Sequence, residues 1–343
     1  MRKCKKHYAV ALATASVMGG FHSTAKALTS FTAGDLVVLQ GGDATNTQTL
    51  DTGTVPAYLD EYNTAGTLIG QVAVPTTASG SNYALTLNNA GSTSHEGVLT
   101  LSENGQYLSF VGYNTGAGTG AALSAGSGTI GVVGNTTSSL STATLIANGG
   151  NNMRAAATID GNEFYVAEAH GTSAGGPGGL NYVSGTGASA TNTVLGGVLD
   201  PRSLVILGGS NTATGALVAG SGSSSFAGYG GSGHGVYGMQ NGSGGLPNTS
   251  STLTGAWINS DASDGSDEVF DNEPNNSNSY HGYNTMYLSG NTSATTGFVE
   301  KYSYNGTVFV EDGSTVLTTS VSDQDPIGPV SYTHLTLPTK RIV

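Results

Sequence analysis

Residues 96–113 decide the fold, and they read EGVLTLSENGQYLSFVGY. Two short runs rich in Val, Leu, Tyr and Phe flank Asn104-Gly105, a pair that accepts the positive φ of a tight hairpin turn. Short runs of this kind, bounded by turn residues, are typical of strands in an antiparallel sheet. The stretch therefore predicts a β-hairpin.

The same plan recurs along the chain. Polar-Gly pairs precede β-rich runs at 65–66, 104–105, 160–161 and 305–306, with a weaker copy at 214–215. The glycines are 39, 56, 54 and 91 residues apart, and we place one degenerate copy near Ala256-Trp257-Ile258 to divide the last interval. Five steps over 240 residues average 48, within the range of about 40 to 50 residues for a propeller blade. We expect an all-β propeller of roughly six four-stranded blades, and an intact protein of seven blades is compatible with the same pattern if the chain is truncated. A β-solenoid is the alternative fold.

The two ends of the chain differ from its body. Residues 1–27 combine a basic start with a short uncharged stretch and a small-residue site, which predicts a secretory signal peptide. Residues 329–343 (PVSYTHLTLPTKRIV) resemble the translation of a sequencing-library adapter, so we interpret them as a foreign tail. Residues 28–328 then form a single propeller-like domain, cut short at its C-terminal end.

The body is strongly acidic and lacks thiols. It keeps three cations, Arg154, Arg202 and Lys301, against 22 acidic residues, so its net charge is 3 − 22 = −19. Such a charge repels phosphate backbones and anionic lipids, so we expect no nucleic-acid partner. We also expect no membrane insertion of the mature chain, because no segment after the signal peptide is continuously apolar over the length of a bilayer span. Cys4 is the only cysteine and lies in the predicted signal peptide, which excludes disulfides and cysteine nucleophiles from the mature chain.

The order of several short motifs resembles a group of secreted bacterial propeller-like proteins that often carry a C-terminal PEP-CTERM sorting anchor. The resemblance implies a propeller fold, export to the cell surface and no characterised activity. Two departures from the pattern are Leu288-Ser289-Gly290, where an acidic residue is expected, and Tyr302 in place of Trp. The motifs are LDEY at 59–62, GTL at 66–68, EGVL at 96–99, GQYL at 105–108, RAA at 154–156, GLNYV at 179–183, NTMY at 284–287 and EKY at 300–302.

A cluster of acidic residues lies between Asn259 and Tyr280, in what we interpret as a long loop. Carboxylate and amide oxygens on such a loop suit Ca²⁺, which takes six to eight oxygen ligands. The spacing differs from that of an EF-hand, and a solvated acidic loop is the alternative. The candidate ligands are Asp261, Asp264, Asp267, Glu268 and Asp271, and calcium is the only cofactor we predict.

The other motifs are weaker indications of a functional site. Ser173 in GTSAG matches a nucleophile elbow, and residues 233–238 match part of a dinucleotide fingerprint, but neither precedes a predicted helix. The body histidines, His95, His170, His234 and His281, have no paired metal spacing, and His95-Glu96 is the first pair to test because it opens a strand. We expect Arg154 to form a buried or half-buried ion pair rather than to bind substrate.

Three functions remain open at this point. The first is a secreted or cell-surface, non-catalytic propeller that binds an extracellular protein or polysaccharide, with calcium ordering its acidic loop. The second is a propeller enzyme, a hydrolase or lactonase-like metal enzyme with polar residues at its axial mouth. The third is an adhesive β-solenoid. Radial blades exclude the third, and converging carboxylates and histidines at the axis favour the second.

Overall fold

The computed structural model describes the greater part of the chain body. The described residues are 26–42, 53–88, 96–118, 128–134, 139–146, 153–168, 179–195, 201–208, 214–221, 235–249, 253–259, 265–274, 276–293 and 296–318. The predicted signal peptide, except residues 26 and 27, and the whole predicted foreign tail lie outside these ranges.

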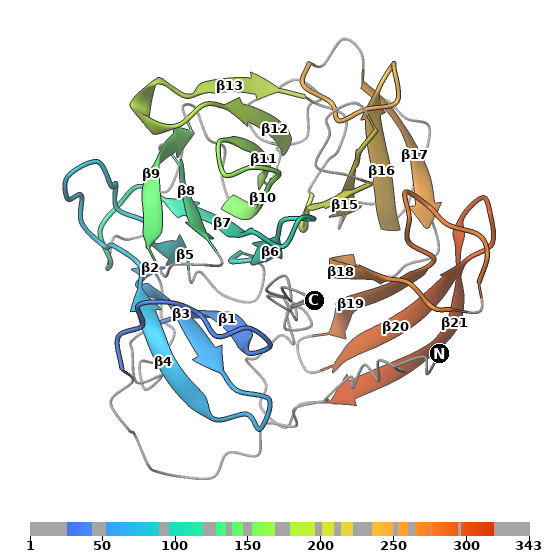
Figure 1. The fold of residues 1–343 in the computed structure, drawn as a ribbon, viewed down its shortest axis with the longest axis horizontal. Helices are drawn as coiled ribbons and strands as arrows, with labels where there is room; N and C mark the ends of the chain where they lie inside the picture. Colours follow the sequence, from blue (N-terminus) through green and yellow to red (C-terminus); the bar gives the residue numbers. More distant parts are fainter. Residues whose placement is uncertain are drawn as a thin grey trace, which may run out of the picture.

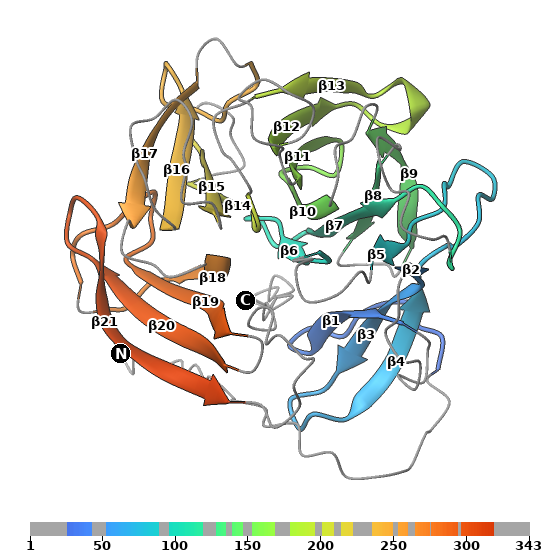
Figure 2. The same ribbon diagram turned by 180° about the vertical axis from the view of Figure 1, so that it is seen from behind.

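Five antiparallel sheets radiate around a common centre (Figure 1; Figure 2 shows the ring from behind). The first blade contains β1 (Leu36–Gly41), β3 (Ala57–Tyr62) and β4 (Leu68–Ala73). The second contains β6 (Thr100–Leu101), β7 (Tyr107–Tyr113), β8 (Gly128–Gly134) and β9 (Leu140–Ile146). The third contains β10 (Met153–Thr158), β11 (Glu163–Glu168), β12 (Gly179–Ser184) and β13 (Thr191–Val194). The fourth contains β14 (Val205–Leu207), β15 (Ala216–Ser221), β16 (Gly235–Asn241) and β17 (Leu253–Asn259). The fifth contains β18 (Gly265–Asp271), β19 (Thr285–Ser293), β20 (Thr296–Tyr304) and β21 (Phe309–Thr318).

The propeller prediction is confirmed, and the radial sheets exclude the β-solenoid. A short extra pair, β2 (Thr54–Val55) with β5 (Leu87–Asn88), lies between the first and second blades. The only helical element among the described residues is a 3-10 turn at Gly187–Ser189, as the Gly-rich composition leads one to expect. Within the described ranges no helix has the length and apolar character needed to cross a bilayer.

The blade count of six, or seven before truncation, is wrong, because the turn glycines are not equivalent. Gly105 and Gly161 turn the first strand of a blade into its second, whereas Gly306 turns the third strand of the fifth blade into the fourth. The interval of 91 residues from Gly215 to Gly306 therefore is not two repeats. Trp257, placed near a hidden copy, lies in β17, the outermost strand of the fourth blade. Asn-Gly and Asp-Gly pairs suit any hairpin in the sheet, so they do not mark the repeat period.

The first blade has three strands in its described part. Its innermost strand, β1, runs in the direction that the second strand has in the other blades. A Cβ on Gly97, just before β6, would lie 3.5 Å from Cδ2 of Leu39, near the end of β1. Thr54, just before β3, donates its hydroxyl to the carbonyl of Gly116, which follows β7, at 2.8 Å. The end of β1 therefore meets the start of β6, so β1 runs opposite to the innermost strand of the second blade.

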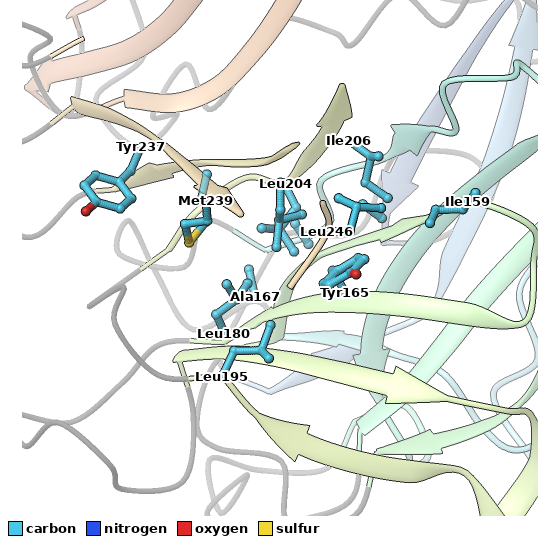
Figure 3. Close-up of a cluster of buried hydrophobic side chains, with 14 residues drawn as sticks. Ile159, Tyr165, Ala167, Leu180, Leu195, Leu204, Ile206, Tyr237, Met239 and Leu246 are labelled. Carbon is cyan, nitrogen blue, oxygen red and sulfur yellow. The ribbon is translucent and has the colours of Figure 1, made fainter. Parts of the chain in front are cut away.

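Apolar side chains fill the spaces between neighbouring blades. Figure 3 shows one such cluster, in which Tyr165 and Leu180 of the third blade pack with Leu204, Ile206 and Met239 from the fourth blade and the segment leading into it. Fully burying a side chain of this size contributes about 1.5–3 kcal/mol. These contacts hold the innermost strands in fixed positions, so polar groups at the strand ends are fixed too.

Candidate functional site

Buried ionisable side chains gather where the innermost strands begin, at what we call the entry end of the propeller. The entry end is the end at which β6, β10, β14 and β18 start. Five charged side chains of the described residues lie there, on the second to fifth blades: Glu96 before β6, Arg154 in β10, Glu168 at the end of β11, Arg202 before β14, and Glu268 in β18. Four of them are at most 8% exposed, and Glu96 is half-buried.

Glu96, just before the second blade, is held by two hydrogen bonds. Its Oε1 accepts a hydrogen bond from the Tyr113 hydroxyl at 2.6 Å, and its Oε2 accepts the Asn88 N–H at 2.9 Å. Burial raises the pKa of Glu96 to about 7, although these two hydrogen bonds and the charge of Arg154 act in the opposite direction. Glu96 is therefore able to exchange a proton near neutral pH.

Arg154 occupies an irregular position in β10. The pairing of β10 with β11 shifts between Met153 and Ala155, so Arg154 is the extra residue of a β-bulge. Its carbonyl accepts the Val98 N–H at 3.1 Å, which joins the start of the second blade to the third. The predicted burial of Arg154 is confirmed, since it is 4% exposed, and its charge acts on Glu96.

Glu268 lies between the fourth and fifth blades. Its Oε2 accepts a hydrogen bond from the Ser203 hydroxyl, and Ser203 Oγ also accepts the Gly220 N–H at 3.0 Å. Burial raises the pKa of Glu268 to about 7, partly offset by hydrogen bonds from Ser203 and from the Gly220 backbone. Oε1 of Glu268 is buried and has no hydrogen-bond partner among the described residues. A protonated Glu268 could donate from this oxygen.

The predicted calcium ligands do not form one set. Asp261 and Asp264 lie outside the described residues, and the acidic segment that we interpreted as a loop includes β18, because residues 265–271 pair with β19. Glu268 and Asp271 are three residues apart in this strand, so they point to opposite faces and lie roughly 10 Å apart. A calcium site at this segment stays a prediction for Asp261, Asp264 and Asp267 alone.

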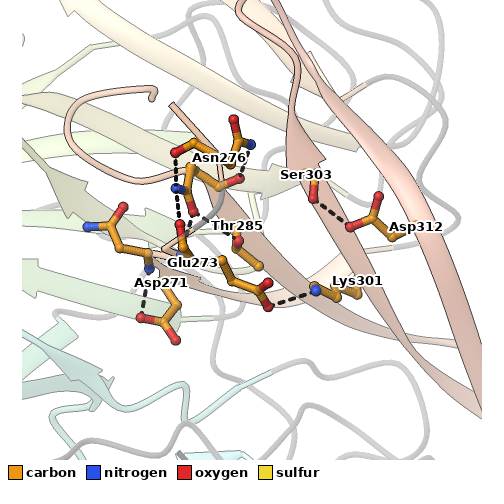
Figure 4. Close-up of polar contacts among 9 residues, drawn as sticks. Asp271, Glu273, Asn276, Thr285, Lys301, Ser303 and Asp312 are labelled. Atoms are coloured by element: carbon orange, nitrogen blue, oxygen red, sulfur yellow. Dashed lines mark hydrogen bonds and ion pairs between the residues drawn. The ribbon is translucent and has the colours of Figure 1, made fainter. Parts of the chain in front are cut away.

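Asp271 belongs to a different polar network, on the fifth blade. Figure 4 shows it beside Glu273, Asn276 and Lys301. Asp271 accepts the Asn272 N–H at 2.7 Å, and Glu273 forms an ion pair of 2.7 Å with Lys301. This pair is partly exposed, so it contributes little, about 0–1 kcal/mol. The network orders the connection between β18 and β19.

No group of three or more metal-ligating side chains occurs in the described part of the chain. His281 lies away from the entry end, in the connection that follows β18, where its Nδ1 donates to the Thr214 carbonyl at 3.2 Å. Burial lowers the pKa of His281, against the effects of Thr214 and Glu103. His95, His170, His234 and Ser173 lie outside the described residues, and residues 235–238 form part of β16 without a following helix.

Sequence reasoning missed Arg202, Glu168 and Ser203 as members of this group. The scarcity of cations in the body pointed to Arg154, and the same signal applied to Arg202. Glu168 and Ser203 stand among residues of ordinary strand composition, and nothing in their local sequence marks them.

Comparisons with known proteins give structural likeness only. No family model matches the chain, and no curated protein does. A 6-phosphogluconolactonase candidate from Bacteroides uniformis aligns at 15% identity and a TM-score of 0.40, over 84% of this chain and 70% of that one. TolB from Acinetobacter baumannii aligns at 12% identity and a TM-score of 0.38, over 86% and 65%. An uncharacterized protein from Listeria monocytogenes aligns at 9% identity and a TM-score of 0.30, over 86% and 70%.

Proposed function

We propose that this protein is an exported, non-catalytic binding propeller whose entry end binds a neutral polysaccharide. One observation carries the proposal: two of the three cations of a body with net charge −19 are buried at the end of the propeller where Glu96, Glu168 and Glu268 also lie. The third cation, Lys301, is paired with Glu273 on the fifth blade.

The chemistry of these groups supports a polyhydroxylated ligand. Arginine offers only donors and an ionised carboxylate only acceptors, whereas a sugar hydroxyl both donates and accepts. Alternating donors and acceptors at neighbouring strand starts therefore match a row of hydroxyl groups. The acidic body disfavours a polyanionic ligand, because its field repels negative charge. Export, and anchoring at the cell surface, rest on the signal-peptide prediction and on the resemblance to PEP-CTERM-associated proteins.

Binding to soluble neutral glucans and mannans, followed by affinity electrophoresis and calorimetry, tests this function. We expect Arg202→Met to weaken binding at least tenfold, since it removes donors without adding charge. Lys301→Met is the matched control, because it removes a cation outside the entry end, and it should bind like the parent. Equal affinities for the two variants would place the site elsewhere, and absence of binding to every neutral glycan would overturn the ligand class.

A lactonase-like or other hydrolytic metal enzyme is the second candidate. His95 directly precedes Glu96, His170 follows Glu168 by two residues, and His234 directly precedes β16. All three therefore flank residues at the entry end. Metal analysis of the purified protein, with lactone hydrolysis assayed after Zn²⁺ or Ca²⁺ addition, distinguishes this candidate. A bound metal lost in His95→Ala but kept in His281→Ala supports it, whereas a metal-free, inactive protein eliminates it.

A further inference from the structure

β21 is the outermost strand of the fifth blade, and its outer edge has no strand beside it in the described part of the chain (Figure 1). It has 10 residues, whereas the outermost strands of the other blades have four to seven. Every side chain from Val310 to Val316 is exposed, and these two valines are 48% and 65% exposed. The strand contains no lysine or proline, two residues that commonly protect an edge against pairing. The edge of β21 is therefore accessible to another strand.

The outermost strands of three other blades are protected in ways that β21 is not. The Leu28 N–H donates to the Gln71 carbonyl in β4 at 3.1 Å, and the Tyr83 N–H donates to the Thr142 carbonyl in β9 at 3.0 Å. Both edges thus carry another segment of the chain. β13 has four residues, which leaves little edge to pair with. Covering an edge and keeping it short are common ways in which sheets avoid unwanted pairing.

The hydrogen bonds of the fifth blade show which backbone groups lie on this edge. The Tyr304 N–H donates to the Asn284 carbonyl at 2.9 Å, so the backbone of Tyr304 in β20 points toward β19. Successive residues of a strand point to opposite sides, so Val299 points toward β21, where it pairs with Thr315. The N–H and C=O of Thr315 therefore face β20. Those of the next residue, Val316, face the open edge.

The charges beside this edge indicate what it would bind. Glu311 and Asp312 are exposed where the pairing of β20 with β21 shifts, and Asp312 accepts a hydrogen bond from the Ser303 hydroxyl at 2.5 Å (Figure 4). Residues 313–318 read GSTVLT, an uncharged run in which threonine and valine favour the extended backbone. The edge therefore combines an acidic end with an uncharged, β-branched stretch.

We propose that the open edge of β21 binds an extended segment of a partner protein by strand addition, and that this segment combines β-branched residues with lysine or arginine. In strand addition, main-chain hydrogen bonds supply the affinity and side chains the specificity. Basic residues would meet Glu311 and Asp312, and they are attracted by a body of net charge −19. A second copy of this chain is disfavoured, since two such bodies repel each other. The surface lies on the outer rim, so this inference goes beyond the proposed function of the entry end.

Fluorescence anisotropy with labelled synthetic peptides tests the proposal on the full chain. The probe is Lys-Val-Thr-Val-Thr-Val-Lys with blocked ends, and the comparison peptide has glutamate in place of both lysines. We expect the basic peptide to bind about tenfold more tightly than the acidic one, and the combined change Glu311→Gln and Asp312→Asn to remove most of this preference. Equal affinity for the two peptides, or no binding of either, would overturn the proposal.

Two proline variants distinguish strand addition from attraction by charge alone. Val316→Pro removes an N–H on the open edge and no bond to β20, so it should weaken binding of the basic peptide about tenfold and hardly change the melting temperature. Val194→Pro is the matched control on β13. The Leu195 N–H donates to the Leu180 carbonyl at 2.8 Å, so the Val194 N–H also points away from its sheet. This variant should bind like the parent, and equal affinities for the two variants would overturn strand addition.

Amide-resolved hydrogen exchange identifies the occupant of the edge. A saturating amount of the basic peptide should slow exchange of the Val316 amide about tenfold. The Thr315 amide, which faces β20, is the internal control and should keep its rate. Protection of Val316 that rises with protein concentration in the absence of peptide would overturn a peptide partner and assign the edge to a second copy of the chain.

Discussion

The hydroxyl of Tyr113 lies 2.6 Å from Oε1 of Glu96 and also accepts the Met153 N–H at 3.1 Å. A phenol has one proton to donate, so it donates to the carboxylate and accepts from the backbone. One side chain thus joins the second blade to the first residue of β10 in the third. It also positions the Glu96 carboxylate, on which the charge of Arg154 acts.

Tyr113→Phe should lower the free energy of unfolding by about 1–3 kcal/mol, because it leaves a buried N–H and a buried carboxylate oxygen without their partner. Urea unfolding measures the loss. Tyr107→Phe is the matched control: Tyr107 begins the same strand, and its hydroxyl makes no hydrogen bond to the described residues. A loss equally large in both variants would mean that the two hydroxyls do not differ in their bonding.

Stability should depend on pH through Glu96 and Glu268. Burial raises the pKa of both to about 7 in the folded state, above the ordinary value of 4.5. The folded protein therefore holds these protons more tightly than the unfolded chain. Their stabilising contribution is complete below about pH 4.5 and is lost as the pH rises through 7, at up to about 3 kcal/mol per group.

Glu268→Gln should flatten this dependence, since an amide does not titrate, and urea unfolding from pH 4.5 to 8 measures it. Glu311→Gln, which replaces an exposed carboxylate on β21, is the control and should keep the slope of the parent. A parent protein whose stability rises from pH 4.5 to 7 would contradict the direction of both pKa shifts.

The sequence was sufficient to predict the class of fold but not the number of blades. Gly66 and Gly105 both sit in turns with positive φ, 77° and 67°, as the Ala-Gly and Asn-Gly pairs predicted. The first, however, joins β3 to β4, and the second leads into β7, so the turns occupy different places in their blades. The residues of a turn indicate that two strands are joined there. Only the pairing with neighbouring strands shows which two strands of the blade these are.

The site was predictable only where composition made a residue rare. Arg154 stood out among 22 acidic residues, and its burial followed from the cost of leaving carboxylates unpaired. The acidic cluster appeared to be a loop because Asp, Ser and Gly disfavour strands. Pairing with β19 nevertheless makes residues 265–271 a strand, and Glu268 is buried through its contact with Ser203. Tertiary pairing overrode the local preference there.

Gly112→Ala should destabilise the protein by about 1–3 kcal/mol through overpacking. A Cβ at this position in β7 would lie 2.5 Å from the Thr86 carbonyl oxygen, a backbone atom that cannot move aside cheaply. Gly116→Ala is the matched control, because its Cβ would meet nothing nearer than the Thr76 carbonyl oxygen at 3.8 Å. Thermal unfolding of the two variants should separate them by several degrees. If Gly116→Ala is the more damaging change, the close approach of the 82–88 segment to β7 is wrong.

Millimolar Ca²⁺ should raise the melting temperature of the purified protein, because Asp261, Asp264 and Asp267 supply carboxylates at the start of the fifth blade. The first two come just before β18, and Asp267 is the third residue of that strand. A ligand at one hundred times its dissociation constant stabilises the folded state by about 2.7 kcal/mol. The combined change Asp264→Asn and Asp267→Asn should abolish the shift. Asp271→Asn should leave it intact, since Asp271 lies at the far end of β18 and is bonded to Asn272. Differential scanning calorimetry with and without chelator measures all three, and a shift that Asp271→Asn alone removes would move the ion to the polar network around Glu273.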